Sequence, residues 1–257
     1  MKILSDAYLL DYKNQLGFDL NAGFGVLQNT SQNADDFRFH VASSAVHSSN
    51  IEGNTVNIDT YLKAAEHNLH LKTKEIKEIN ELIGAYNFAR ENALTLVNLL
   101  KSHELMTTSI LQKKERGKIR KVQVGVRSDG RLIYLAIEPE LVKVELEKLF
   151  EDIVALLSID LTTEEVFYYA AYIHLVFVNI HPFVDGNGRV TRLLEKWFLS
   201  KKLGPNAWSI ASEKMYWHNR QAYYKNLQLG VNYYEVKYEK CVPFLLMLSS
   251  ALRHEAV

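Results

Sequence analysis

The sequence predicts an all-α fold that is interrupted by a single β-hairpin. Apolar residues recur at steps of three and four over most of the chain, which is the spacing of amphipathic helices. Helix-ending residues are few, with four prolines and twelve glycines among 257 residues. The strict alternation that is typical of strands occurs once, in residues 119–137. Hydrophobic residues make up 47% and charged residues 23%, the balance of a soluble globular protein.

The first half of the chain is expected to form four helices. The first lies within residues 31–53, where Ser31 or Asn33 would cap its start and Gly53 would follow its last turn. A short helix over 57–68, a firm amphipathic helix over 73–92 and a weaker one over 102–115 follow. The residues at helical spacing are Phe37, Val41, Ala45 and Ser48 in the first and Ile76, Ile79, Ile83 and Tyr86 in the third.

The hairpin is expected where Val122, Val124 and Val126 alternate with other residues. Asp129-Gly130 would form its tight turn, and the β-prone segment "LIYLAI" would return as the second strand. Pro139 then begins another helix, since proline is favoured in the first helical turn.

The remaining chain is again helical. Thr162 and Glu165 form a capping box ahead of the apolar segment 166–180, which at fifteen residues is too short to span a bilayer. Lys201 and Lys202 would occupy the last turn of a helix that Gly204-Pro205 ends. Two further helices are expected over 213–230 and 235–253, so one compact unit is the simplest account.

Composition excludes several classes of protein. Lys plus Arg equals Asp plus Glu at 30 each, so no overall field favours nucleic acid or an anionic membrane. The single cysteine, Cys241, rules out an internal disulfide and a cysteine-based zinc site, and its apolar surroundings indicate a buried thiol. The first residues lack the pattern of a secretory signal, and we expect a cytoplasmic protein.

The segment "HPFVDGNGRVTR", residues 181–192, concentrates the groups that could do chemistry. Pro182 disfavours the helical conformation at His181, so the apolar helix should end there. A helix C-terminus favours the imidazolium form, and this environment suits a general base. His174, seven residues earlier on the same helix, is expected to be a hydrogen-bonded core residue. The other candidates, His40, His47, His67 and His70, are expected to lie on the surface or to serve packing.

The next helix should begin near Asn187, which leaves its first N–H groups free to bind an anion. Gly186 and Gly188 would let the backbone approach a ligand closely. Arg189 and Arg192 could both reach a polyanion, and Asp185 could hold Mg²⁺ together with phosphate oxygens. The alternative is an ordinary capped loop with surface arginines.

The nine residues "HPFVDGNGR" resemble the signature of the Fic domain family at every position. The likeness extends over about residues 45–250, which implies a Fic-type helical core (45–257, with the inhibitory helix) and an N-terminal helical extension (1–44). It implies transfer of AMP from ATP, with Mg²⁺, to a target Tyr, Thr or Ser hydroxyl. His181 would be the base, Asp185 the metal ligand, and Gly186, Asn187, Gly188, Arg189 and Arg192 the phosphate contacts. Relatives that phosphorylate carry lysine at position 188, so Gly188 favours nucleotide transfer.

A second segment, "SSNIEGN", resembles the inhibitory motif of many Fic proteins through Ser48, Glu52 and Gly53. The resemblance implies that Glu52 pairs with Arg192 and occupies the guanidinium meant for the γ-phosphate. An arginine–carboxylate pair is strong and geometrically specific, so ATP would bind with its α-phosphate misplaced for attack. The plain alternative is a solvated carboxylate ahead of a helix-ending glycine.

Partners follow from the same resemblance. The hairpin 119–137 could dock an extended target segment along a strand edge, or it could only cover the core. Asn232 is a candidate adenine contact, whereas the Tyr and Trp residues of 215–224 are expected to pack.

The same scaffold could move another group or remove AMP, and a helical nucleic-acid-binding module is the remote alternative. The oligomeric state stays open, although self-association that constrains the inhibitory helix could control the enzyme.

Overall fold

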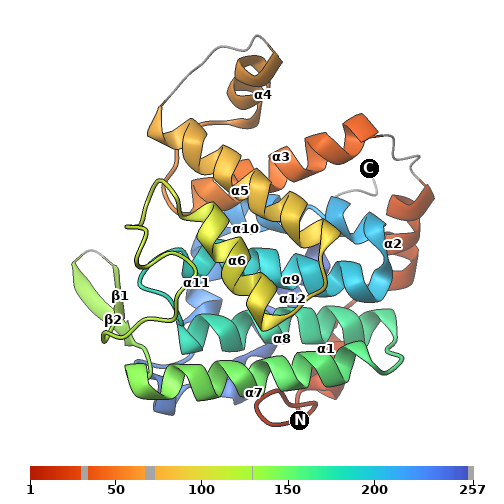
Figure 1. Ribbon diagram of the computed structural model, residues 1–257. Coiled ribbons are helices and arrows are strands. Elements are labelled where there is room, and N and C mark those ends of the chain that lie inside the picture. The colour runs from red at the N-terminus through yellow and green to blue at the C-terminus, as the bar shows by residue number, and fades with distance from the viewer. Residues whose placement is uncertain (30–33, 67–72, 129, 254–257) are drawn as a thin grey trace.

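The computed structural model describes residues 1–29, 34–66, 73–128 and 130–253, and within these ranges the chain forms twelve α-helices and one two-stranded hairpin (Figure 1). The predicted fold class is therefore confirmed. The elements are α1 Leu9–Gln15, α2 Leu20–Asn29, α3 Ala34–Ile51, α4 Ile58–Glu66, α5 Lys74–Glu91, α6 Leu96–Met106, β1 Gly125–Ser128, β2 Arg131–Leu135, α7 Pro139–Leu157, α8 Thr163–Ile180, α9 Asn187–Leu203, α10 Ser212–His218, α11 Arg220–Leu227 and α12 Val242–Ser250, with short 3-10 helices η1 Pro205–Ser209, η2 Tyr233–Glu235 and η3 Tyr238–Lys240.

The local signals at the helix ends hold where the structure describes them. Gly53 has a φ of 97°, as expected after the last turn of α3. The capping box of Thr162 and Glu165 is present at the start of α8, and Pro139 opens α7. The proposed caps Ser31 and Asn33 lie outside the described residues, as do His67 and His70 and the turn residue Asp129.

Three of the expected helices were placed wrongly. The helix expected over 235–253 is α12, which begins only at Val242 after the short 3-10 helix η3. The helix expected over 102–115 is α6, which begins at Leu96 after the cap Thr95 and ends at Met106. It stops because Thr107 and Thr108 return their hydroxyls to carbonyls of the preceding turn, while Glu81 accepts the N–H of Ser109. The helix expected over 213–230 is divided into α10 and α11 at Asn219, which adopts a non-helical conformation.

Helix α8 is the centre of the core. It packs against α7, α9 and α12, and nearly all of its residues are buried. Figure 1 shows α7, α8 and α9 stacked side by side, with α5 and α6 crossing in front of α9. Such a helix needs apolar residues on every face, which explains the long apolar run before the motif.

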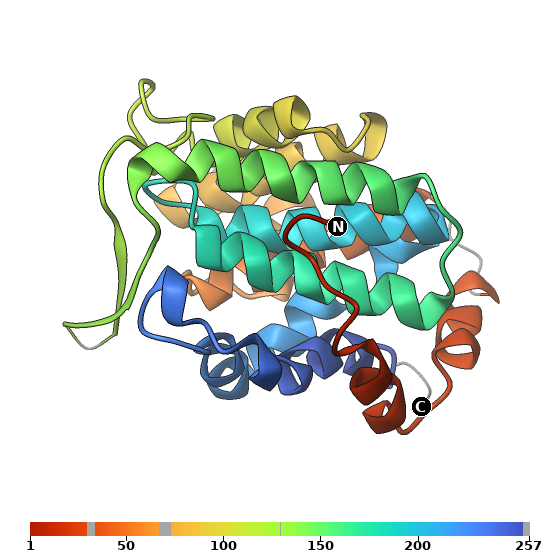
Figure 2. The ribbon, with the colours of Figure 1, turned by 90° about the horizontal axis from the view of Figure 1, so that it is seen from below.

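The N-terminal residues are packed into the same core. Asp152 of α7 accepts the backbone N–H groups of Lys2, Ile3 and Leu4, and Tyr12 of α1 is buried with its hydroxyl on Ser249 of α12. Figure 2 shows this first segment crossing α8 before α1 begins. Position 44, where a boundary was expected, lies inside α3.

The hairpin projects from one end of the molecule (Figure 2). Its two strands pair antiparallel, with a bulge between Val126 and Arg127. Beyond the bulge, Leu135 donates its N–H to the carbonyl of Val231 and so joins β2 to the segment before η2.

Two further expectations concern burial. Cys241 is buried at the start of α12, and burial raises the pKa of its thiol to about 12, which agrees with an inert core cysteine. Within the described residues, no helix has the length and apolar character needed to cross a bilayer.

Candidate active site

Helix α8 ends at His181 with an unusual backbone conformation. The φ of His181 is 53°, in the left-handed region, and it is the one described non-glycine residue with a positive φ. Pro182 explains why the helix stops there, and burial of the following loop holds the conformation. Non-glycine residues in this region are uncommon and gather at functional sites.

The loop returns to a helix through Gly186, the N-cap of α9, with a φ of 81°. A Cβ at Gly186 would lie 3.0 Å from the Thr107 side chain and 3.2 Å from the His103 ring. Both the conformation and the space therefore require glycine. The predicted start of this helix near Asn187 is confirmed.

Asn187 holds the loop from inside, which differs from its expected role. Its Oδ1 accepts the N–H of Phe183 at 2.9 Å, and its Nδ2 donates to the carbonyl of Phe183 at 2.8 Å. Both polar atoms of the amide thus form hydrogen bonds within the loop. Asn187 as a residue is 3% exposed. The amide therefore closes the loop, and its expected contact with phosphate stays a prediction.

His103 of α6 supports the same loop from outside, a role that no sequence pattern predicted. Its ring stacks on Phe183 with centroids 3.6 Å apart. Nδ1 accepts the N–H of Gly117, so the proton sits on Nε2, which donates to the carbonyl of Asp185 at 2.9 Å. Burial lowers the pKa of His103 to about 4 and keeps it in this neutral form.

Arg120 is a second support that lies far away in the sequence. Its Nε donates to the carbonyl of His181 at 2.8 Å, and its Nη2 donates to the carbonyl of Ile137. Its own N–H reaches the carbonyl of Pro182 at 2.9 Å. A single buried arginine thus connects the catalytic loop to the end of the hairpin segment.

The expected imidazolium form of His181 is wrong. Burial lowers the pKa of His181 to about 4, and the Arg120 charge acts in the same direction. These effects outweigh the helix end, whose influence is worth far less than the removal of water from an ion. Nδ1 lies 3.3 Å from the carbonyl of Val178, which can only accept, so Nε2 is the basic nitrogen.

Arg189 is buried without the usual partners of a guanidinium. It is 8% exposed, and its Nε and Nη1 have no hydrogen-bond partner within the described residues. A buried cation of this kind is costly unless an anion joins it. Asp185, by contrast, is exposed at the loop, with Oδ1 accepting the N–H of Gly186 at 2.5 Å.

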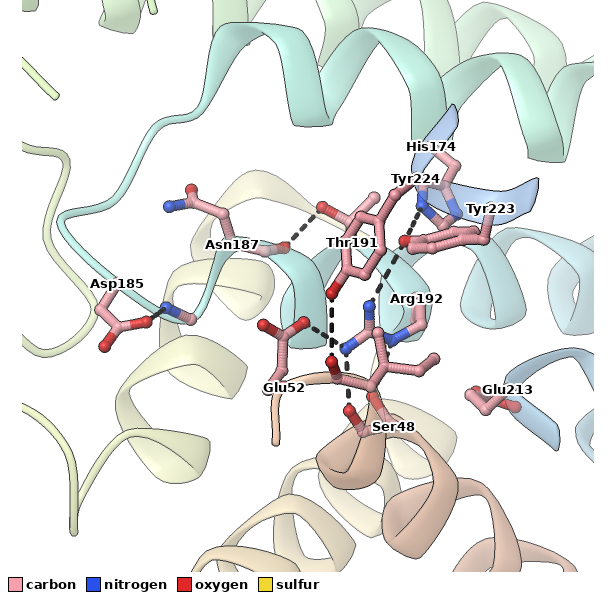
Figure 3. A network of polar contacts seen from close by, with 12 residues as sticks. Ser48, Glu52, His174, Asp185, Asn187, Thr191, Arg192, Glu213, Tyr223 and Tyr224 are labelled. Carbon is pink, nitrogen blue, oxygen red and sulfur yellow. Dashed lines mark hydrogen bonds and ion pairs between the residues drawn. The ribbon is translucent and has the colours of Figure 1, made fainter. Parts of the chain in front are cut away.

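The expected pairing of Glu52 with Arg192 is present. Nη2 of Arg192 donates to Glu52 Oε1 at 2.8 Å and to the carbonyl of Ser48 at 3.0 Å, and Nε donates to Ser48 Oγ at 2.9 Å (Figure 3). Although burial alone would raise the pKa of Glu52, the Arg192 charge lowers it overall, so the carboxylate is ionised. Ser48 and Glu52 of the motif thus meet at one guanidinium.

Glu52 also lies directly over the start of α9. A Cβ at Gly188 would stand 2.2 Å from Glu52 Oε1 and 3.1 Å from Arg192 Nη1. The carboxylate therefore fills the space above the helix N-terminus, where an anion would otherwise be attracted.

A cavity of about 590 Å³ opens beside these groups. It extends from the base and the Glu52–Arg192 pair to the hairpin on one side and to α11 on the other. Its lining includes Glu52, Val126, Arg127, Ser128, Val178, Asn179, His181, Asn187, Gly188, Arg192, Tyr223, Tyr224, Leu227 and Gln228.

Asn232 is absent from this lining, and its expected adenine contact stays a prediction. Its Oδ1 instead accepts the N–H groups of Tyr234 and Glu235 and caps η2. The segment that does reach the cavity is the end of α11, with Tyr224 and Gln228.

His174 is a buried, hydrogen-bonded residue as expected. Its Nδ1 lies 2.7 Å from Glu195 Oε2, and its Nε2 lies 3.0 Å from the hydroxyl of Tyr223. Tyr223 was expected only to pack, but its hydroxyl also accepts Nη1 of Arg192 at 3.3 Å. It is therefore part of the polar site.

No cluster of three or more potential metal-ligating side chains occurs in the part of the chain that the structure describes. A metal here would depend on oxygen atoms of a bound substrate. The arrangement as a whole is a neutral histidine and two buried arginines around a helix N-terminus, which defines a site for a phosphorylated substrate.

Comparison with known proteins agrees with this class. Residues 93–199 match the model of the Fic/DOC family. The chain is 33% identical over 191 residues to "Protein adenylyltransferase fic-1" of Caenorhabditis elegans, covering 68% of this chain and 35% of that protein. It is 34% identical over 164 residues to "Protein adenylyltransferase Fic" of Nematostella vectensis, covering 58% and 35%. The chain thus spans about a third of these curated relatives.

Solved structures share the fold. A Fic family protein from Desulfovibrio desulfuricans G20 superposes with a TM-score of 0.75 at 22% identity, covering 98% of this chain and 74% of that one. Fic-1 (residues 134–508) of C. elegans gives a TM-score of 0.70 at 19% identity, covering 96% and 71%. The chain carries a Fic/DOC family domain on the Fic helical fold.

Proposed function

We propose that this protein is a protein adenylyltransferase that transfers AMP from ATP to a target hydroxyl and is held inactive by Glu52. The observation that carries the proposal is the cavity beside His181 and the start of α9, where Arg192 is paired with Glu52. The names of the curated relatives support the activity.

The reaction is an in-line displacement at the α-phosphorus. The target oxygen forms a bond to phosphorus as the bond to the bridging oxygen of the β-phosphate breaks, and pyrophosphate leaves. The hydroxyl proton passes to Nε2 of His181, whose Nδ1 proton is directed at the Val178 carbonyl. Such a reaction needs positioning and charge neutralisation more than covalent help from the protein.

The site offers that neutralisation to a triphosphate. The unpartnered nitrogens of Arg189 and the free N–H groups at the start of α9 would contact phosphate oxygens. Arg192 would take the γ-phosphate once Glu52 has left it. The side chain of Asn187 is not among these contacts in our proposal, because both its polar atoms close the loop.

The residues also fit Mg²⁺ in the way that nucleotide enzymes use it. Asp185 is an exposed hard oxygen donor on the loop, and one carboxylate plus substrate phosphates is a common protein share of a magnesium site. When bound, the metal would neutralise phosphate charge. Binding of Mg²⁺ would depend on substrate oxygens. Among the described residues, Asp185 is not part of a cluster of metal-ligating side chains.

In this proposal the hairpin presents the target. Val126, Arg127 and Ser128 of β1 line the cavity, and within the described sheet β1 has β2 as its one neighbour. An extended target segment could add to the open edge of β1 through main-chain hydrogen bonds. Its hydroxyl would then enter the cavity whatever the surrounding side chains are.

The test compares wild type with Glu52→Gly and His181→Ala by transfer of label from α-³²P ATP to protein in a lysate with Mg²⁺. Glu52→Gly should label protein about 10- to 100-fold faster, because a small misplacement of reacting atoms costs that much rate. Adding His181→Ala to Glu52→Gly should abolish the signal. Equal labelling by wild type and Glu52→Gly would remove the inhibitory role of Glu52.

The same labelled proteins distinguish the alternatives. A mass increase of one AMP on a Tyr, Thr or Ser side chain supports the proposed transfer. Loss of AMP from a purified modified target on addition of wild-type protein would instead favour removal as the reaction, with Glu52 positioning water.

A further inference from the structure

A chain of buried polar side chains leads from Arg192 into the core, starting at a different nitrogen from the one that binds Glu52. Nη1 of Arg192 donates to the hydroxyl of Tyr223 at 3.3 Å, and that hydroxyl lies 3.0 Å from Nε2 of His174. Nδ1 of His174 lies 2.7 Å from Oε2 of Glu195, which also accepts the hydroxyl of Tyr216 at 2.8 Å. Figure 3 shows Tyr223 and His174 on the far side of the guanidinium from Glu52.

All of these residues are at most 1% exposed, so no bulk water completes their hydrogen bonds. Their rings are fixed by mutual packing: His174 lies edge-on to Tyr216, Tyr223 and Phe244, with centroids 5.1 to 5.8 Å apart. Buried networks of this kind are costly when broken and define one arrangement when satisfied.

The proton positions along the chain follow from its two ends. Arginine only donates, so the Tyr223 oxygen must accept from Arg192 and its proton is left to point at Nε2 of His174. His174 then carries its proton on Nδ1 and donates it to the Glu195 carboxylate. In this direction every donor has an acceptor, and the Tyr223 oxygen presents its negative side to the guanidinium.

The chain becomes important when Glu52 leaves. Of the contacts that Arg192 makes, Glu52 is the one full negative charge, and its loss leaves a buried cation. The remaining contacts are Ser48, which belongs to the same inhibitory helix, and Tyr223, which belongs to α11. Tyr223 is thus the anchor of Arg192 that does not depend on the inhibitory helix.

We propose that Tyr223, backed by His174 and Glu195, is a positioning residue that keeps the Arg192 guanidinium aimed at the γ-phosphate after Glu52 withdraws. The inference rests on the proposed adenylyltransferase function and adds a determinant of selectivity for nucleoside triphosphates. A diphosphate lacks the group that Arg192 would contact, so its binding does not depend on this anchor.

The test measures binding of the α,β-methylene analogues of ATP and ADP, with Mg²⁺, by calorimetry in the Glu52→Gly protein. These analogues have a P–C–P bridge that the reaction cannot cleave. Adding Tyr223→Phe should weaken the ATP analogue about fivefold, the effect of one long hydrogen bond, and change the ADP analogue less than about twofold. Tyr12→Phe, which removes another buried tyrosine hydroxyl far from the site, should change neither.

Glu195→Gln provides an independent variant. It keeps the shape of the side chain and removes the carboxylate charge at the end of this series of hydrogen bonds. It should weaken the ATP analogue in the same direction, and the double variant with Tyr223→Phe should be no weaker than Tyr223→Phe alone, because both act through one chain. Equal loss for both analogues, additive losses in the double variant, or no loss at all would overturn the proposal. Failure of Glu52→Gly itself to bind the ATP analogue would count against the proposed function instead.

Discussion

His181 is a residue on which two physical effects act in opposite directions. A position at the end of α8 favours a charged imidazole, whereas burial favours a neutral one, and burial prevails with a pKa of about 4. In the proposed reaction His181 is the general base, and the neutral ring would be ready to accept a proton across the physiological range. The left-handed backbone of His181 fixes the direction of the ring.

Proton NMR of the imidazole rings can check this state directly. In the nucleotide-free protein the His181 signals should not titrate between pH 8 and pH 5.5, because the neutral form persists until the pH approaches about 4. The His181→Ala spectrum assigns the signals. A midpoint near 6.5, the value of an unperturbed histidine, would show that the helix end dominates after all.

At the scale of elements, the catalytic loop between α8 and α9 is held from both sides. Asn187 closes it internally, while His103 from α6 and Arg120 from the segment before β1 bind its carbonyls. Three separate parts of the chain therefore converge on six loop residues. Rigid support of this kind keeps catalytic groups within the narrow tolerance that catalysis needs.

Removal of the internal closure should be costly. Asn187→Ala leaves the N–H and the carbonyl of buried Phe183 without partners, and we expect the free energy of unfolding to fall by about 2 to 4 kcal/mol. Urea denaturation followed by circular dichroism measures the change. Asn98→Ala, which removes an exposed amide from α6, is the control and should cost less than about 1 kcal/mol. A similar loss in both variants would mean that the Asn187 amide does not close the loop.

The two halves of the site differ in how far the sequence could predict them. The ends of α8 and α9, the glycine conformations and the pairing of Glu52 with Arg192 follow from short motifs with local rules or a family pattern. His103, Arg120 and Tyr223 could not be found in this way, because each reaches the site through contacts between distant segments. The loop-closing contacts of Asn187 were not predicted, because its amide has two local partners that only the closed loop reveals.

The boundary of α6 and the division of α10 from α11 illustrate the same limit. Apolar spacing continues past Met106, but side-chain hydroxyls and Glu81 satisfy the backbone groups there in another way. Periodicity states which face a helix would bury, and competing hydrogen bonds decide where it ends.

On the scale of the whole molecule, α3, which ends just before Glu52, is part of the core. Lys196 of α9 binds Ser44 of α3 and pairs with Glu213 of α10, one turn along from the contact of Arg192 with Ser48. Both ends of these contacts are buried. In the proposed mechanism we therefore expect release of Glu52 to move its side chain and the last turn of α3, while these contacts hold the body of the helix.

The neutral forms of His103 and His181 also predict how the free energy of unfolding depends on pH. His103 and His181 have folded pKa values of about 4, below the ordinary 6.5, so the unfolded chain binds protons first as the pH falls. The free energy of unfolding should be highest above about pH 6.5 and should decrease toward pH 4. Between pH 7.5 and pH 5, His103 and His181 together should lower it by up to roughly 4 kcal/mol. Burial lowers the pKa of His40 and His47 in the same direction, whereas the lowered pKa values of Glu52 and Glu213 act only below this range.

Urea denaturation at the two pH values measures the loss, and His103→Gln isolates one contributor, since glutamine does not titrate. The loss should shrink by about half of the pair's share in His103→Gln, and an unchanged loss would show that His103 is not held neutral by burial.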